Sequence, residues 1–172
     1  MRPIDIEFLN KKSPYAITCD GADGYSFATG FGVEYIIYFM PDYSIWNEGA
    51  YQFVIANRNQ RKSPNDPKVK EAVLAIIEGF FDSNQAILLY VCETGDGKEA
   101  LRNRLFLRWM SEYDNRSIYY LEHVELQVER IDNYATLIVQ KTNPRLNEII
   151  EEFQRAIDEI RKPNDHFKRQ QI

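Results

Sequence analysis

The first half of the chain alternates hydrophobic and polar residues with the period of two that is typical of β-strands. In residues 33–40, Val33, Tyr35, Ile37 and Phe39 fall on one face, and residues 51–56 alternate in the same way. The runs 15–19 and 25–30 are separated by the sequence DGADG, whose Asp-Gly pairs suit the positive φ of a tight turn. The pattern predicts a β meander of three or four strands.

The hydrophobic period changes to 3.6 in two later segments, which predicts two amphipathic helices. The first helix is expected to begin at an Asn65 or Asp66 cap with Pro67 at its first position, and its apolar stripe is Val69, Ala72, Val73, Ile76, Ile77, Phe80 and Phe81. The last helix is expected after Asn143 and Pro144, and its stripe is Leu146, Ile150, Phe153, Ile157 and Ile160. The spacing of the last stripe also fits a short coiled coil, so both a monomer and a homodimer are compatible with the sequence.

The remaining elements decide the fold class. Residues 86–92 are apolar on both alternations, as in a central strand, and 117–130 and 134–140 are expected to pair as antiparallel strands. With a third helix after residue 98, the order is βββ(β)-α-β-α-β-β-α. This order lacks strict βαβ alternation and predicts an α+β fold: a largely antiparallel twisted sheet of about six to seven strands with three helices. We expect one domain over residues 1–172, with 1–12 and 163–172 as frayed tails.

Composition narrows the choice of partners. The 172 residues carry a net charge of -5 with a pI near 5.2, which disfavours nonspecific binding to nucleic acid or anionic membrane. The sequence contains neither an apolar signal segment at its start nor a run long enough to span a bilayer. Cys19 and Cys92 stand far apart and fit two reduced thiols, so a cytoplasmic location is expected.

The stretch YVCETGDGKEALRNRLFLRWM, residues 90–110, first suggests a phosphate-binding loop that opens a helix. A Walker loop is excluded because Glu99 follows Gly97-Lys98 where Ser or Thr is needed, and because position 92 is not glycine. A capping box explains the turn better: Asp96 and Glu99 each accept a hydrogen bond from the other's backbone N–H. A looser pyrophosphate loop of the acetyltransferase kind stays open as an alternative.

The helix after this turn places an arginine on its apolar side. Leu101, Leu105, Trp109 and Tyr113 form the expected stripe, which Phe106 and Met110 extend, and Arg102 falls within it between Leu105 and Phe106. A guanidinium in that position must be paired or must line a cavity, since an isolated buried charge is costly.

Three readings of this arginine are open. Glu122 shares the alternation of two apolar residues in the strand 117–130, so a buried Arg102–Glu122 pair is one hypothesis. A simpler reading lets both side chains reach solvent at an edge. In the third reading, Arg102 and Arg104 bind an anionic ligand.

Other candidate chemistry is sparse. His123, His166 and the two cysteines show no zinc-binding spacing, and we expect neither a metal nor a cofactor. The loop after residue 40 carries Tyr43 and Trp46, which are candidates for a stacking surface for a ligand, although strand aromatics more often belong to the core.

The run 92–109 resembles a family of small uncharacterised bacterial proteins, a domain of unknown function. The resemblance rests on Cys92-Glu93, on Asp96-Gly97, and on the block Arg102-x-Arg104-Leu105-Phe106-x-x-Trp109. Members of that family more often have Asp at the position of Glu93 and Arg at that of Lys98. The resemblance implies a bacterial, cytosolic, single-domain protein and transfers no catalytic residue.

These observations favour a non-enzymatic binding or interaction module for a protein partner or a small anionic ligand. The candidate ligand-binding residues are Arg102, Arg104, Tyr43 and Trp46. The alternative is a small enzyme that uses an acyl-CoA or a nucleotide near the 93–98 turn and Arg102/Arg104.

Overall fold

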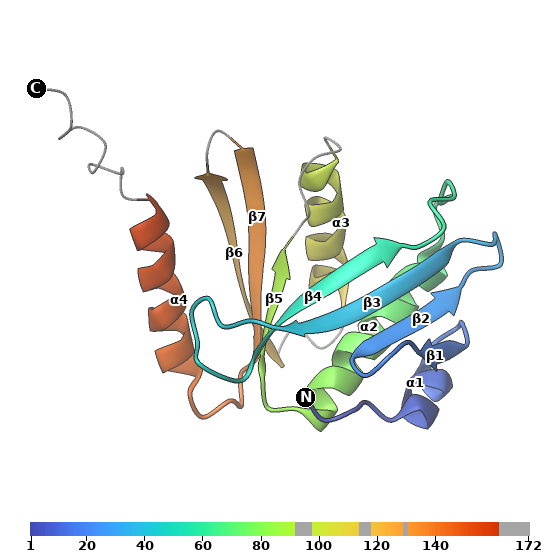
Figure 1. Cartoon of the computed structure of the whole chain (residues 1–172), viewed down its shortest axis with the longest axis horizontal. Helices are drawn as coiled ribbons and strands as arrows, with labels where there is room; N and C mark the ends of the chain where they lie inside the picture. The colour runs from blue at the N-terminus through green and yellow to red at the C-terminus, as the bar shows by residue number, and fades with distance from the viewer. Residues whose placement is uncertain (92–97, 114–117, 129–130, 162–172) are drawn as a thin grey trace, which may run out of the picture.

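The computed structural model describes residues 1–91, 98–113, 118–128 and 131–161, which form one seven-stranded sheet with four helices (Figure 1). The strands are β1 (Ile17–Cys19), β2 (Gly24–Ala28), β3 (Glu34–Pro41), β4 (Ala50–Asn57), β5 (Ile87–Val91), β6 (Tyr119–Val128) and β7 (Ile131–Gln140). The helices are α1 (Ile6–Lys12), α2 (Pro67–Ser83), α3 (Glu99–Glu112) and α4 (Leu146–Arg161). No described helix has both the length and the apolar run that crossing a membrane requires.

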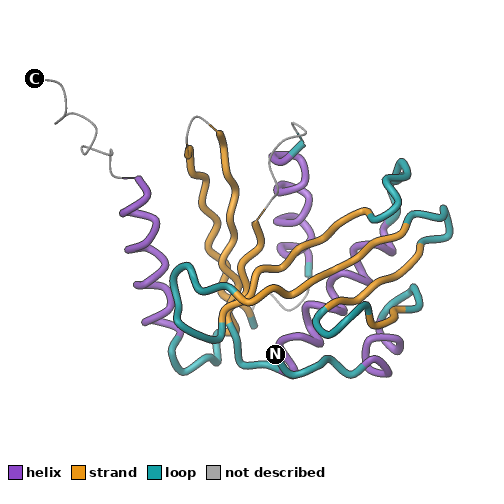
Figure 2. Tube along the Cα trace, in the orientation of Figure 1, coloured by secondary structure: helices purple, strands orange, loops and turns teal. Residues whose placement is uncertain are grey.

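The strand order in the sheet is β1-β2-β3-β4-β5-β7-β6. The strands β4 and β5 pair in parallel, while the other described pairs are antiparallel. Figure 2 shows the strong twist of this sheet, with β2–β4 running across the picture and β5–β7 running upright. The prediction of an α+β fold with a largely antiparallel sheet is confirmed.

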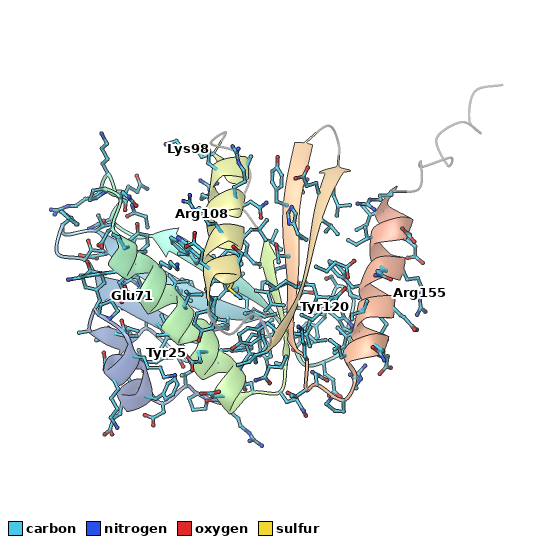
Figure 3. All side chains as sticks on the ribbon, turned by 180° about the vertical axis from the view of Figure 1, so that it is seen from behind. Tyr25, Glu71, Lys98, Arg108, Tyr120 and Arg155 are labelled. Carbon is cyan, nitrogen blue, oxygen red and sulfur yellow. The ribbon has the colours of Figure 1, made fainter. Side chains whose placement is uncertain are left out.

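The two faces of the sheet carry separate cores. Helices α1, α2 and α3 cover one face, with α2 behind the sheet in Figure 1 and in front of it in Figure 3. Helix α4 covers the other face through Ile149, Phe153 and Ile157. Successive residues of β5 therefore point to different helices: Leu88 faces α2 and Leu89 faces α4. This explains why residues 86–92 are apolar on both alternations.

Helix α2 is the most deeply buried helix of the described chain, as its sequence predicts. Asp66 caps it by accepting a hydrogen bond from the Lys68 N–H at 3.1 Å, and Pro67 takes the first helical position. All seven residues of its predicted stripe are buried. The ring of Phe80 stacks on Phe39 of β3 with centroids 4.5 Å apart, which fixes α2 on the sheet.

Helix α1 is a fourth helix, where three were predicted. It lies in the segment 1–12, which was expected to fray, and its Leu9 is fully buried against α2. Asp5 caps it by accepting from the Glu7 N–H at 2.9 Å. The sequence pattern missed α1 because seven residues with one buried apolar side chain produce almost no periodic signal. The other expected tail, 163–172, lies outside the described residues.

The apolar faces of α3 and α4 differ from those predicted. In α3 the residues that pack on the sheet are Asn103, Phe106 and Met110, whereas Leu101 and Leu105 are 60% and 37% exposed. The buried face of α3 thus centres on Phe106 and Met110, which were predicted to extend the stripe, and not on Leu101 and Leu105. In α4 the buried side chain is Ile149 rather than Ile150, and Ile160 is exposed.

Gly79 of α2 gives a test of the α1–α2 contact. A Cβ at this position would lie closest to the Ile4 Cγ2 atom and 3.0 Å from the Leu9 Cδ2 atom. We therefore expect Gly79→Ala to lower the free energy of unfolding by about 1–3 kcal/mol through overpacking, measured by equilibrium urea denaturation.

The matched background is Ile4→Ala, which removes the closest contact. There the added cost of Gly79→Ala should shrink, while Lys68→Ala on the exposed side of α2 should change little. A rise in stability on Gly79→Ala, as helix propensity alone would give, would contradict this close approach.

Candidate functional site

A cavity of about 840 Å³ opens on the face of the sheet that α2 and α3 cover. Strands β3 and β4, the segment 57–63 after β4, and the side of α3 that faces away from the sheet core enclose it. Its volume lies in the range of pockets that hold drug-sized molecules. It is the larger of the two cavities described below, and it contains the residue that the sequence singled out, Arg102.

Four cationic side chains line this cavity: Arg61 and Lys62 from the segment 57–63, and Lys98 and Arg102 from α3. We call it the basic cavity. Within the described lining there is no Asp or Glu, and Arg61 and Lys62 form no ion pair with another described residue. Lys98 and Arg102 stand one turn apart at the start of α3, where the Arg102 N–H donates to the Lys98 carbonyl at 3.0 Å. Figure 3 labels Lys98 at this end of the helix.

Two asparagines hold the segment that carries Arg61. The side-chain amide of Asn57 donates to the Arg61 carbonyl at 2.7 Å, and Asn59 donates to the Gly32 carbonyl at 2.8 Å. Gly32 has a φ of +72°, and a Cβ there would collide with the Arg61 guanidinium. The guanidinium therefore rests against the turn between β2 and β3, so that its position is set by two neighbouring loops.

Aromatic side chains form the rest of the wall. Tyr90 of β5 and Phe106 of α3 stack with centroids 3.8 Å apart. Tyr35 of β3 bonds Ser63 through its hydroxyl, with the two oxygens 2.6 Å apart, which ties the end of the segment 57–63 to the sheet. Trp109 of α3 is half-buried, and within the described chain its indole makes neither a hydrogen bond nor a ring contact.

A second cavity of about 510 Å³ adjoins the basic cavity. The two share part of their lining, namely Tyr35, Ser63, Val69, Leu105 and Trp109. The charged residues around the second cavity balance, with two acids and two bases: Asp66, Glu112, Lys70 and Arg108. Lys70 of α2 donates to Glu112 of α3 at 2.7 Å, and this hydrogen bond lowers the pKa of Glu112. The ion pair bridges the two helices at the far end of the cavity.

The structure does not bring Arg102 and Glu122 together. Glu122 lies on the face of the sheet that α4 covers, where it accepts from the Tyr120 hydroxyl at 2.7 Å and from the Gln154 amide at 3.4 Å. Arg102 projects from α3 on the opposite face and lines the basic cavity. A guanidinium on this side of the helix was expected either to be paired or to line a cavity, and Arg102 lines a cavity.

The other residue of the predicted arginine pair lies elsewhere. Arg104 is exposed, does not line the basic cavity, and donates to the Ala100 carbonyl of its own helix at 3.3 Å. Asp96 of the predicted capping box lies outside the described residues, as do 93–97 of the predicted turn, and of Glu99 only the backbone is described. Helix α3 begins at Glu99, and Lys98 takes the N-cap position, where its side chain does not cap the backbone N–H groups of the helix.

The two aromatics of the loop between β3 and β4 do not form a joint surface. Trp46 is buried beneath α4, where its ring stacks on Phe153 at 6.3 Å, whereas Tyr43 is 70% exposed. Asp42 holds this loop by accepting hydrogen bonds from the Ser44 N–H at 2.8 Å and from Gln52 at 2.7 Å. Trp46 therefore belongs to the core, which is the alternative that the sequence left open.

His123 faces α3, where it meets a buried asparagine. Its Nδ1 lies 3.1 Å from the Ala135 carbonyl and so carries the proton, while Nε2 accepts from Asn103 at 3.3 Å. Asn103 is 2% exposed and orients α3 on the sheet through this bond. No pattern in the sequence indicates this pair, since Asn103 does not belong to the predicted apolar stripe.

The comparisons with known proteins bear on the α3 side of the site. A model of a family of unknown function, DUF6169, matches residues 65–155, which is more than half of the chain. The chain belongs to the DUF6169 family. The DUF6169 region runs from the start of α2 into α4 and contains Lys98, Arg102 and Trp109, whereas Arg61 and Lys62 precede it. Comparison with curated proteins and with solved structures gives no significant match.

Sequence reasoning missed half of the basic cavity. The stretch RNQRKSPNDP, residues 58–67, has the composition of a loop that connects two elements, and it holds Arg61 and Lys62. A signal was present: Arg58, Arg61 and Lys62 cluster in an otherwise acidic chain. What the sequence does not reveal is that this cluster lies across from the first turn of α3.

The Asp42 network gives a prediction about pH. Burial raises the pKa of Asp42, but hydrogen bonds from Ser44 and Gln52 outweigh it and leave the pKa below its ordinary value of 3.8. A carboxyl group whose pKa is lower in the folded than in the unfolded protein stabilises the fold at any pH above its pKa in the unfolded protein. This stabilisation is lost as the pH falls through its pKa in the folded protein. We expect Asp42→Asn to cost about 1–3 kcal/mol at neutral pH and to flatten the loss of stability in acid.

Urea denaturation at pH 7, 4 and 3 measures both effects. Asp158→Asn, on the exposed side of α4, is the matched control and should follow the unsubstituted protein. If Asp42→Asn lowers the free energy of unfolding by the same amount at pH 3 as at pH 7, the ionised carboxylate does not contribute the stability that its hydrogen bonds indicate.

Proposed function

We propose that the protein is a non-enzymatic binding protein for a small organic anion, held in the basic cavity. The observation that carries this proposal is the convergence of Arg61, Lys62, Lys98 and Arg102 on one cavity from two segments distant in sequence. An anion there meets four cationic side chains, of which Arg102 is half-buried and the other three are exposed. Charge-assisted hydrogen bonds are stronger than those between neutral groups. Two of the four are arginines, whose planar fork suits phosphate and carboxylate oxygens.

The negative net charge of the chain strengthens the argument from these four cationic side chains. A chain of net charge -5 repels anions at long range, so a local group of cations has to be built by the fold. The first turn of α3 adds the positive end of a 14-residue helix to the same wall. Both features support recognition of an anion at this place.

The lining also supports binding rather than catalysis. Its described residues include neither His, Cys, Asp nor Glu, the groups that most often transfer protons or attack substrates near neutral pH. The alternative of a docking surface for a protein partner has less support, because the exposed large apolar residues of the described chain are spread over several segments, and only Leu101 and Leu105 share a helix: Phe31, Met40, Tyr43, Leu101, Leu105, Ile118 and Ile160.

We place the protein in the cytoplasm. Cys19 is a free, exposed thiol, a form that a reducing compartment preserves.

Thermal shift assays with inorganic pyrophosphate, citrate and ADP test the proposal. At about 100 times the dissociation constant, a binding anion should raise the melting temperature by roughly 5–10 °C. The double variant Arg61→Ala/Lys62→Ala and the variant Arg102→Ala should each weaken binding at least tenfold, since each removes charged hydrogen-bond donors. Added salt should weaken binding as well.

The matched control is Arg104→Ala, which removes an arginine from the same helix without touching the cavity. It should bind as the unsubstituted protein does. The proposal fails if none of the three anions binds, or if Arg104→Ala reduces binding as much as Arg102→Ala does.

A further inference from the structure

We infer that the ligand is a nucleoside phosphate, with its phosphates in the basic cavity and its base in the adjoining cavity beside Trp109. This inference rests on the proposed function and deepens it by naming the ligand class and its orientation. Four observations carry it: the size of the two cavities, their different charge, the state of Trp109, and the ion pair that ends the second cavity.

The size of the two cavities favours a ligand larger than a simple inorganic anion. The basic cavity measures about 840 Å³ and continues into a second cavity of about 510 Å³ through shared lining residues. Phosphate or pyrophosphate alone would leave most of this space to water, since one water takes roughly 30 Å³. The space suits an organic molecule with an anionic part and a larger uncharged part.

The charges that line the two cavities indicate how such a molecule is oriented when it is bound. The basic cavity carries four cations and, within its described lining, no acid, which suits two or more negative charges. The adjoining cavity carries balanced charges, so it favours an uncharged polar group over an anion. Ser63 and Asn65 line it as well and provide hydroxyl and amide groups for hydrogen bonds.

The junction of the two cavities is aromatic. Trp109 of α3 and Tyr35 of β3 both line both cavities, together with Leu105. Tyr35 already stacks on Phe27, with centroids 5.4 Å apart, and bonds Ser63. Trp109 is different, because within the described chain its half-buried indole has neither a ring partner nor an acceptor for its N–H. A planar base supplies both a face for stacking and acceptor atoms.

The ion pair between α2 and α3 sets the length of the site. Lys70 and Glu112 join the helices at the end of the second cavity, 2.7 Å apart. Tyr113 next to it donates to Glu78 of α2 at 2.8 Å and strengthens the same closure. The accessible length therefore runs from the cations at the start of α3 to this bridge, and a nucleoside phosphate has an anionic end and a planar end to match it.

ADP and pyrophosphate are a matched pair of probes, since they share the diphosphate and differ by the nucleoside. Titration calorimetry on the full chain should give an affinity for ADP at least tenfold higher than for pyrophosphate. Trp109→Ala should remove this difference and leave pyrophosphate binding unchanged, and Trp109→Phe should restore part of it. Arg61→Ala/Lys62→Ala should weaken both ligands.

Tryptophan fluorescence gives a second readout that does not depend on a folded Trp109→Ala variant. The chain has two tryptophans, and Trp46 lies in the core on the other face of the sheet. In Trp46→Phe the emission comes from Trp109 alone, and it should change on addition of ADP but much less on addition of pyrophosphate.

The possible outcomes separate the inference from the proposed function. If pyrophosphate binds as tightly as ADP and Trp109→Ala changes neither, the inference is overturned while anion binding stands. If an anion such as citrate binds through Arg61 and Lys62 but ADP does not, the inference is again overturned. If no anion binds, or if ADP binding is insensitive to Arg61→Ala/Lys62→Ala and matches that of adenosine, both fail.

Discussion

The stacking of Phe80 on Phe39 joins α2 to the sheet, and the rest of this face depends on that contact. Helix α2 is buried by the sheet on one side and by α1 on the other, where Gly79 allows Leu9 to approach. Because α2 lies under the meander β1–β4, α3 has to pack on the other half of the sheet, against β5–β7. The basic cavity and the cavity that adjoins it open beside α3, between this helix, the segment 57–63 and the start of α2.

The two helices meet at one end and separate at the other. Lys70 and Glu112 join them where α3 ends, and the start of α3 is left to face the segment 57–63 across the basic cavity. The buried contact of Asn103 with His123 holds α3 on the sheet from the other side. Polar contacts thus fix the inclination of α3, and apolar contacts fix its distance from the sheet.

The sequence predicts most of the fold because its elements are strongly periodic. The stripe of α2, the cap at Asp66 and the doubly apolar β5 are all found as predicted. Helix α1 was missed because it is short, and the buried face of α3 was located only in part, because Leu105 and Trp109 of the predicted stripe border a cavity. Helical periodicity reports which residues avoid water, and it does not distinguish a core from a cavity wall.

Arg102 stands out in the sequence because a charged residue is unusual on the apolar face of a helix. The sequence does not show which residues surround it in the folded protein. Arg61 lies 41 positions earlier in the chain, and only the parallel pairing of β4 with β5 brings the two segments to one cavity. The Arg102–Glu122 hypothesis failed for the same reason, because assigning an alternation to one strand does not say which helix covers that face.

The parallel pair β4–β5 also has a consequence for how the protein assembles. Within the meander β1–β4 and within the hairpin β6–β7, each strand pairs with the strand next to it in the chain. Strands β4 and β5 are parallel, so the chain must cross back through α2 before β5 can pair with β4. Contacts that close long loops form late and slow folding. The basic cavity takes cations from both sides of this crossover, so neither locally folded half contains a site. Occupancy of the cavity would then report that the whole chain has completed its fold.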